Sequence, residues 1–250
     1  MGLPIIGHLV RKGFRTLASD IDPKKKSEVE KRGAIWQSDL AGECDILLVC
    51  VGFDREVVEL LEHGLAPRPG GVVAILSTVH PETVQELARK ARGMHIIDST
   101  VCRGGEAADK GALLSFVGGP AQVVARITPV LRAYSSDVVH TGDVGSAQVA
   151  KAVNNLILWA CLVADHEGLA LAKRYGVDVE KLRRALLMSS ATNDALEKWG
   201  RQTMAWAEDD MEIVAAMAEK QGIALPQAEV TREICRSLKP RRYKLDDYGV

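Results

Sequence analysis

The sequence predicts an α/β domain followed by an all-α domain, and two observations carry this prediction. In the first part of the chain, short apolar runs alternate with segments of helical periodicity, as in parallel strands joined by crossover helices. After residue 140 the helical periodicity continues without a further strand-like run. We therefore predict one domain over residues 1–140 and a second over residues 141–250.

The individual elements follow from these two patterns. Proline opens three of the helices between the strands, in agreement with its preference for the first helical turn. The expected strands are 14–19, 45–51, 71–77, 94–98 and 112–119. The expected helices are 1–13, 23–32, 55–63, 81–92, 120–133, 146–175, 178–188, 208–221 and 227–237.

Composition restricts the partners and the compartment. The chain has 32 basic and 33 acidic residues, a net charge of −1, so charge does not favour nucleic acid or an anionic membrane. Apolar runs such as 45–51 are too short to span a bilayer, and the N-terminus lacks a secretion-signal pattern. Five scattered cysteines without a CxxC pair indicate neither disulfides nor a metal site. We expect a cytoplasmic protein.

The N-terminal segment is typical of the phosphate-binding end of a nucleotide-binding sheet. In a Rossmann-type domain, the helix after a glycine turn begins at the pyrophosphate, and an acidic residue after the second strand binds the ribose hydroxyls. Gly2 lies at the start of a predicted helix, and Asp20 follows the next predicted strand, 18 residues later. Asp20 favours NAD over NADP, because a carboxylate repels a 2′-phosphate. The alternative is an ordinary aspartate at a strand end.

The first strand of such a domain is missing from the predicted pattern, because no strand and no Gly-x-Gly pair precede Gly2. That strand is central to the sheet, so its absence is expected to leave backbone groups of its neighbours unpaired. Two explanations stay open. Met1 is an internal methionine of a longer reading frame, or the chain is a genuine fragment.

The segment 142–155, GDVGSAQVAKAVNN, is a candidate for chemistry. A glycine turn precedes a helix on which Lys151 and Asn155, four residues apart, share one face. The helix continues with apolar residues, and a lysine in such surroundings can act as a general acid or base near neutral pH. The alternative is a lysine that extends to water from the first turns of a core helix.

Taken together, several blocks resemble the β-hydroxyacid dehydrogenase family, which includes 3-hydroxyisobutyrate dehydrogenase and 6-phosphogluconate dehydrogenase-like proteins. The resemblance covers nearly the whole chain, and the order and spacing of the blocks support it. The similar segments are 1–14, 19–23, 76–83, 98–119 and 142–155.

The resemblance implies roles for individual residues. It places Thr78 beside the nicotinamide, Lys151 as the acid or base, and Asn155 as the residue that orients the substrate. It places the substrate carboxylate at Cys102, Arg103, Gly104 and Gly105, where the glycines allow close approach of backbone amides. Arg103 adds a charged contact to that carboxylate, or faces solvent as loop arginines often do.

Two departures from the family pattern bear on activity. Cys102 replaces a serine, so a weaker thiol donor stands where a hydroxyl is usual and the choice of substrate can differ. No base adjoins Cys102 in the sequence, which does not favour a redox role. By the same resemblance, Asp209 replaces a lysine that approaches the cofactor and substrate. An anion at this position weakens the binding of anionic ligands unless another cation compensates.

Three hypotheses of function follow. The first is hydride transfer between NAD, with NADP less favoured by Asp20, and a small β-hydroxy acid with a carboxylate, with Lys151 as general acid/base. The second is a non-catalytic scaffold of the same fold, supported by the missing strand and by Asp209. The third is imine reduction, against which Lys151 argues. The broadly apolar helix over 146–175 and the resemblance both indicate a homodimer or homotetramer.

Overall fold

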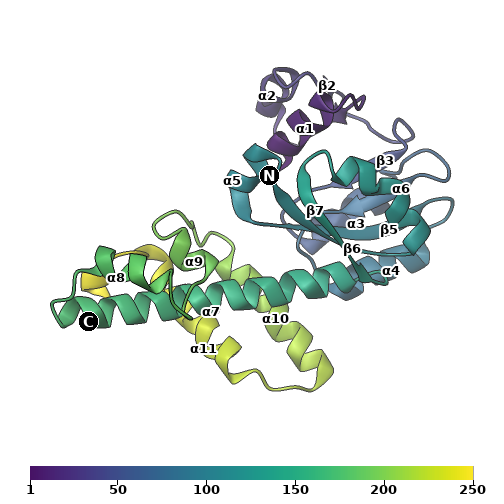
Figure 1. The fold of residues 1–250 in the computed structure, drawn as a ribbon. Coiled ribbons are helices and arrows are strands. Elements are labelled where there is room, and N and C mark those ends of the chain that lie inside the picture. The colour runs from purple at the N-terminus through teal and green to yellow at the C-terminus, as the bar shows by residue number, and fades with distance from the viewer. Residues whose placement is uncertain (250) are drawn as a thin grey trace. The chain divides into compact units, whose positions relative to one another are not determined.

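A computed structural model describes residues 1–249 and shows two compact units, Met1–Lys151 and Ala152–Val250. The division falls inside the long helix α7, Ser146–Arg174, whose first turns belong to the first unit (Figure 1). The sequence pattern places its boundary near residue 140, where strands give way to helices along the chain. The two units are described separately.

The first unit is built on a five-stranded sheet with the strand order β3-β4-β5-β6-β7 (Figure 1). A separate two-stranded parallel sheet is formed by β1 and β2. Within residues 1–249, no strand joins β1 to β3, so one edge of each of these strands has no ladder partner. The strands are β1 Leu17–Ala18, β2 Ile35–Trp36, β3 Ile46–Val49, β4 Val72–Ile75, β5 His95–Cys102, β6 Leu113–Gly118 and β7 Ser135–Gly142.

The prediction of an all-parallel sheet is wrong at one position, because β6 runs antiparallel to β5. The two strands are joined by the short helix α5, Gly104–Lys110, which has left-handed backbone at Arg103 before it and at Gly111 after it. A parallel pair needs a longer crossover, of about a dozen residues or more. The short connection therefore reverses the direction of the chain and makes the sheet mixed.

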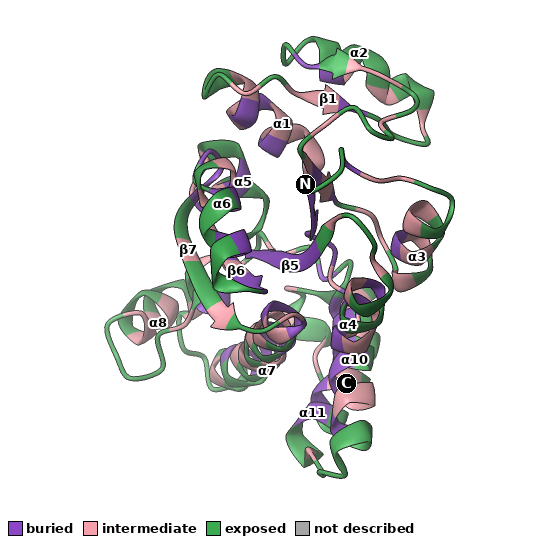
Figure 2. Cartoon of the chain, turned by 90° about the vertical axis from the view of Figure 1, so that its right-hand side faces the viewer, coloured by how far each residue is buried: buried purple, intermediate pink, exposed green. Residues whose placement is uncertain are grey.

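Helices cover both faces of the five-stranded sheet, and β4 shows why. Val72 and Ala74 pack with one apolar cluster, whereas Val73 and Ile75 pack with another, as expected for a strand buried on both faces. The first cluster includes residues of α1, α5 and α6, and the second includes residues of α3 and α4. Figure 2 shows the buried β5 in the middle of this unit. The helices are α1 Gly2–Arg11, α2 Lys26–Glu30, α3 Asp54–Glu62, α4 Pro81–Lys90 and α6 Ala121–Leu131.

Strands β2 and β7 were not predicted from the sequence. Strand β7 cannot be predicted from a hydrophobic pattern, because most of its residues are exposed or half-buried and buried and exposed positions do not alternate clearly. Strand β2 has only two residues and pairs with β1 alone. Both strands owe their extended form to neighbours that are distant in sequence, not to a local apolar pattern.

The second unit is all-α, as predicted, and its core forms between α7, α10 and α11. The C-terminal segment packs on α7, where the backbone N–H of Tyr243 donates to Nε2 of His166 at 2.9 Å. Lys173 and Asp246 form an ion pair at 2.6 Å. The helices after α7 are α8 Val179–Leu186, α9 Asp194–Glu197, α10 Ala207–Gln221 and α11 Pro226–Leu238.

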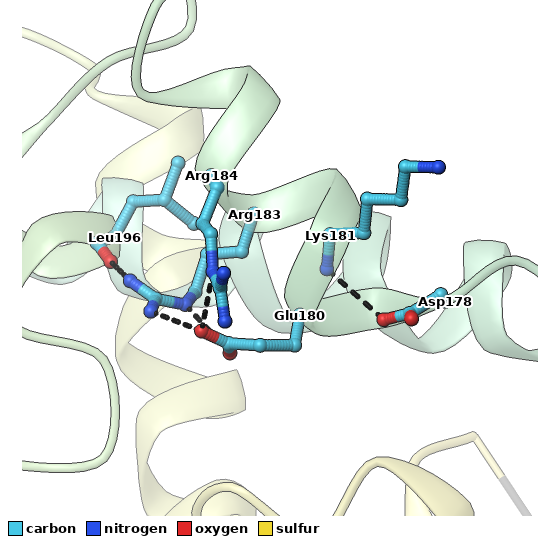
Figure 3. A network of polar contacts seen from close by, with 6 residues as sticks. All are labelled: Asp178, Glu180, Lys181, Arg183, Arg184 and Leu196. Carbon is cyan, nitrogen blue, oxygen red and sulfur yellow. Dashed lines mark hydrogen bonds and ion pairs between the residues drawn. The ribbon is translucent and has the colours of Figure 1, made fainter.

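Helix α8 is stabilised both by local contacts at its start and by a contact with a neighbouring helix (Figure 3). The side chain of Asp178 caps the helix by accepting from the N–H of Lys181 at 3.0 Å. Arg183 binds Glu180 within the helix at 2.7 Å and donates to the carbonyl of Leu196 in α9 at 3.1 Å. Arg183 thus links α8, which the periodicity predicts, to α9, which it does not predict.

Candidate functional site

Lys151 lies on α7 beside the end of β5. Its Nζ is 3.9 Å from Sγ of Cys102, the last residue of that strand. Lys151 is half-buried and Cys102 is buried. The structure therefore brings together two residues, 49 positions apart, that the sequence analysis assigns to proton transfer and to substrate binding.

The first turn of α7 is held by β5 through buried polar contacts. The carboxylate of Asp98 accepts from the N–H of Gly145 at 2.8 Å and from the N–H of Gln148 at 2.9 Å. A carboxylate at a helix N-terminus satisfies N–H groups that have no partner within the helix. Burial raises the pKa of Asp98, while these hydrogen bonds lower it. Thr100 adds a hydrogen bond to the carbonyl of Ala147 at 3.0 Å, which fixes the helix start on the sheet.

A buried glutamine holds the Thr78 segment to the same helix. Oε1 of Gln148 accepts from the N–H of Val79 at 3.0 Å, and Nε2 donates to the carbonyl of Ser77 at 2.8 Å. Gln148 therefore binds the residues on both sides of half-buried Thr78, one helical turn before Lys151. Its effect is to fix the segment after β4 relative to the helix that carries the lysine.

The loop after Cys102 has unusual backbone geometry. Arg103 has φ of 85° and Gly104 has φ of 78°, both in the left-handed region that favours glycine. The Arg103 guanidinium donates to Asp137 at 2.6 Å and to Ser136 at 2.9 Å on β7. This geometry favours a surface role for Arg103 over contact with a substrate carboxylate. The amides of Gly104 and Gly105 begin α5.

The predicted cofactor residues of the first unit lie on α1 and after β1. Gly2 is the first residue of α1, which has no side-chain cap at its N-terminus and no acidic residue in its first turn. Asp20 is exposed, and one of its oxygens accepts from the N–H of Asp22 at 2.9 Å. An uncapped helix N-terminus suits a pyrophosphate, and an exposed carboxylate suits ribose hydroxyls. These residues fit a dinucleotide.

Asn155 and Asp209 belong to the second unit. Asn155 is buried on α7, one turn after Lys151, and its Oδ1 accepts from Asn154 at 3.0 Å. Asp209 is exposed in the first turn of α10. The adjacent Asp210 is buried and accepts from Nε1 of Trp159 at 2.9 Å. The two neighbouring aspartates therefore have different surroundings within this unit.

Sequence reasoning missed Gln148 and Asp98, the two side chains that position α7. Gln148 had a signal, because it precedes Lys151 by three residues and Asn155 by seven, which places all three on one helical face. No such spacing signal identifies Asp98, because its partners Gly145 and Gln148 lie 47 and 50 residues away in the chain. Among the described residues, no group of three or more His, Cys, Asp or Glu side chains is suited to a metal ion.

Known proteins match both parts of the chain. Residues 1–142 match the NAD-binding domain of 6-phosphogluconate dehydrogenase, and residues 145–248 match the NAD-binding domain of NADP-dependent 3-hydroxyisobutyrate dehydrogenase. A 3-hydroxyisobutyrate dehydrogenase from Pseudomonas aeruginosa is 33% identical over 205 residues, 78% of this chain and 69% of the relative. The chain belongs to the β-hydroxyacid dehydrogenase family. It is therefore an oxidoreductase that uses a nicotinamide cofactor and acts on CH–OH groups.

Solved structures show the same fold. The structure of Mycobacterium tuberculosis 3-hydroxyisobutyrate dehydrogenase with L-serine has a TM-score of 0.86 at 21% identity, over 97% of this chain and 91% of the other. An imine reductase variant from Myxococcus stipitatus in complex with NAD+ has a TM-score of 0.67 at 18% identity, over 99% and 93% of the two chains. Because dehydrogenases and imine reductases share this fold, the site residues must distinguish between the two activities.

Proposed function

We propose that this β-hydroxyacid dehydrogenase transfers a hydride between NAD and a small β-hydroxy acid, with Lys151 as the general acid and base. The observation that carries the proposal is the half-buried amine of Lys151 on a helix bound to the sheet by Asp98 and to the Thr78 segment by Gln148. Proton transfer requires a group held in such a fixed position. An amine there suits an alcohol substrate, whose hydroxyl must lose a proton.

The residues around Lys151 have different roles toward the substrate. The amides of Gly104 and Gly105 bind the carboxylate, and the Cys102 thiol lies beside the carbon skeleton. In the direction of oxidation, neutral Lys151 takes the hydroxyl proton, and in reduction its ammonium returns it. Asn155, on the same face of α7, orients the substrate oxygen. A bound nicotinamide supplies the hydride acceptor.

Residues of the first unit would hold the cofactor. The N–H groups at Gly2 would hold the pyrophosphate, Asp20 would bind the ribose hydroxyls, and Thr78 would contact the nicotinamide ring. We propose NAD as the preferred cofactor, because the Asp20 carboxylate repels the 2′-phosphate of NADP. Asp209, which by the family resemblance replaces a lysine, adds negative charge that lowers affinity for an anionic cofactor and substrate.

The test is a pair of measurements on the full chain. Titration with NADH followed by fluorescence is expected to show binding, and oxidation of 3-hydroxy acids is expected to require Lys151. The Lys151→Met variant should keep cofactor affinity and lose turnover by about two to four orders of magnitude, as for removal of a general acid or base. The exposed Lys181, changed to methionine, is the control.

Three results would contradict this proposal. Absence of NADH binding favours the scaffold hypothesis. Unchanged turnover in Lys151→Met removes the assigned role of the lysine. A higher rate with cyclic imines than with hydroxy acids favours imine reduction.

We also propose that the chain forms a homodimer or homotetramer in the cytoplasm. Val149, Val153 and Ile157 are exposed at four-residue spacing along α7, an apolar stripe that a second copy would cover. Within the second unit, Ile157 also lines an apolar groove of about 440 Å³ between α7 and residues 224–228. Sedimentation is expected to show an oligomer that Ile157→Glu dissociates. A monomer at micromolar concentration would contradict the proposal.

A further inference from the structure

The contact between Lys151 and Cys102 joins two nucleophiles. Their separation of 3.9 Å is supported by hydrogen bonds from side chains of β5 to the backbone of α7, because Asp98 and Thr100 hold the first turn of that helix. Cys102 is only 4% exposed, while the half-exposed lysine reaches solvent. A long, flexible lysine side chain can cover the remaining distance to the sulfur without movement of the backbone. The pair is thus arranged for a reaction between the two side chains.

We propose that Cys102 and Lys151 form a reversible sulfur–nitrogen bond, a sulfenamide, when the protein meets a hydroperoxide. The bond would be a modification site within the candidate active site. Its formation by a hydroperoxide does not depend on the proposed catalytic function. Its effect on turnover rests on the proposed function of Lys151.

The reaction has two balanced steps. In the first, the sulfur attacks one peroxide oxygen, the O–O bond breaks, and Cys102 is oxidised by two electrons to a sulfenic acid while the peroxide is reduced to water or an alcohol. In the second, the neutral amine attacks the sulfur, the S–N bond forms, and the S–O bond breaks. The departing hydroxide takes a proton from nitrogen and leaves as water, so this step needs no further oxidant.

In the described part of the chain, none of the other cysteines has a lysine amine in contact with its sulfur, as Cys102 has. Burial raises the pKa of the thiols of Cys44, Cys50 and Cys161, and it raises the pKa of Cys235 to about 12. A thiol with a raised pKa holds less of the thiolate that reacts with peroxide. We expect the sulfur–nitrogen bond to form at Cys102, because the amine of Lys151 lies 3.9 Å from its sulfur.

Reduction reverses the bond. A small thiol attacks the sulfur of the sulfenamide, the S–N bond breaks, and the nitrogen takes back a proton. A second thiol then releases Cys102 from the mixed disulfide. While the bond exists, Lys151 cannot exchange a proton with a substrate, so the oxidised protein is expected to be inactive and to recover on reduction.

Mass spectrometry of the full chain tests the inference. After brief treatment with hydrogen peroxide, the wild-type chain is expected to become lighter by the mass of two hydrogen atoms, because a bond replaces them. Trypsin should then yield peptide 93–103, which carries Cys102, joined to peptide 133–173, in which cleavage after Lys151 is blocked. Dithiothreitol should restore the original mass and the separate peptides.

Three variants sharpen the test. Lys151→Arg keeps a cation but lacks a nucleophilic amine, so it should accumulate a sulfenic acid that dimedone traps at Cys102. Cys102→Ser should form neither product. Cys44→Ser, the matched control, should form the bond as the wild type does. Each variant is compared with its own untreated sample.

The outcomes separate this inference from the proposed function. Gain of oxygen at Cys102 without joined peptides would overturn the inference, as would equal cross-linking in Cys102→Ser. If the bond forms in a chain that never oxidised a hydroxy acid, the inference stands and the proposed function fails. If the chain is active and its loss of activity in peroxide tracks the joined peptides, both are supported.

Discussion

Replacement of Gln148 by leucine tests whether the Thr78 segment and the Lys151 helix are held together by one side chain. The variant removes hydrogen bonds of 3.0 Å to the N–H of Val79 and of 2.8 Å to the carbonyl of Ser77. Gln148, Ser77 and Val79 are all buried, at 1%, 4% and 0% exposure, so water does not readily replace the lost partner. Each backbone group left unpaired costs about 1–3 kcal/mol, so we expect a total loss of roughly 2–6 kcal/mol.

Native-state hydrogen exchange measures this loss directly. The amide of Val79 loses its acceptor in Gln148→Leu, and a change of about 3 kcal/mol would speed its exchange about 100-fold. Turnover should fall in the same variant, because Thr78 and Lys151 are no longer fixed relative to each other. Gln85→Leu is the control: Gln85 donates to the carbonyl of Val144 at 3.1 Å but is exposed, so the expected loss is below about 0.5 kcal/mol. Equal losses in the two variants, with unchanged exchange at Val79, would refute the reasoning.

Three further predictions concern stability. Gly118→Ala should destabilise the first unit by about 1–3 kcal/mol in urea unfolding. The reason is that the new Cβ would lie 2.5 Å from Oδ1 of Asp98 and 2.8 Å from the carbonyl of Asp143. A loss of stability below about 0.5 kcal/mol would contradict this prediction. Arg103→Gly should be more stable than Arg103→Ala by about 1 kcal/mol, since both lose the exposed ion pair with Asp137 but only glycine relieves φ of 85°; equal melting temperatures would argue against strain. Burial lowers the pKa of His166, so the unfolded chain binds the proton more tightly, and the stability of the second unit should be complete above pH 6.5 and decrease as the pH falls below it. His166→Gln should flatten that pH dependence, and an unchanged slope would show that another group is responsible.

The fold class could be read from the sequence because it depends on local periodicity. The five expected strands overlap β1, β3, β4, β5 and β6, and the helical second part was predicted as such. Pairing direction was not predictable in the same way. The antiparallel β5–β6 pair depends on a ten-residue connection, 103–112, in which Arg103 adopts a left-handed conformation that its residue type does not indicate.

In the candidate site, too, features that depend on nearby residues could be predicted, whereas contacts between residues distant in sequence could not. The shared helical face of Lys151 and Asn155 follows from their spacing, and the glycines at 104 and 105 are visible in the chain. The alternatives for Arg103 stayed open in the sequence, because its partner Asp137 is 34 residues away. Likewise, the sequence offered no base beside Cys102, yet the structure places the amine of Lys151 next to its sulfur.

The sequence by itself therefore determined the change from an α/β part to an all-α part, the helix that carries Lys151, and the family to which the chain is similar, because these depend on periodicity and on short motifs. Only the tertiary structure decided how that helix is held and what Lys151 touches. The reason is physical: Asp98, Gln148 and Cys102 act through hydrogen bonds and contacts between residues 47 to 71 positions apart, and such pairs exist only once the sheet has brought its strand ends together.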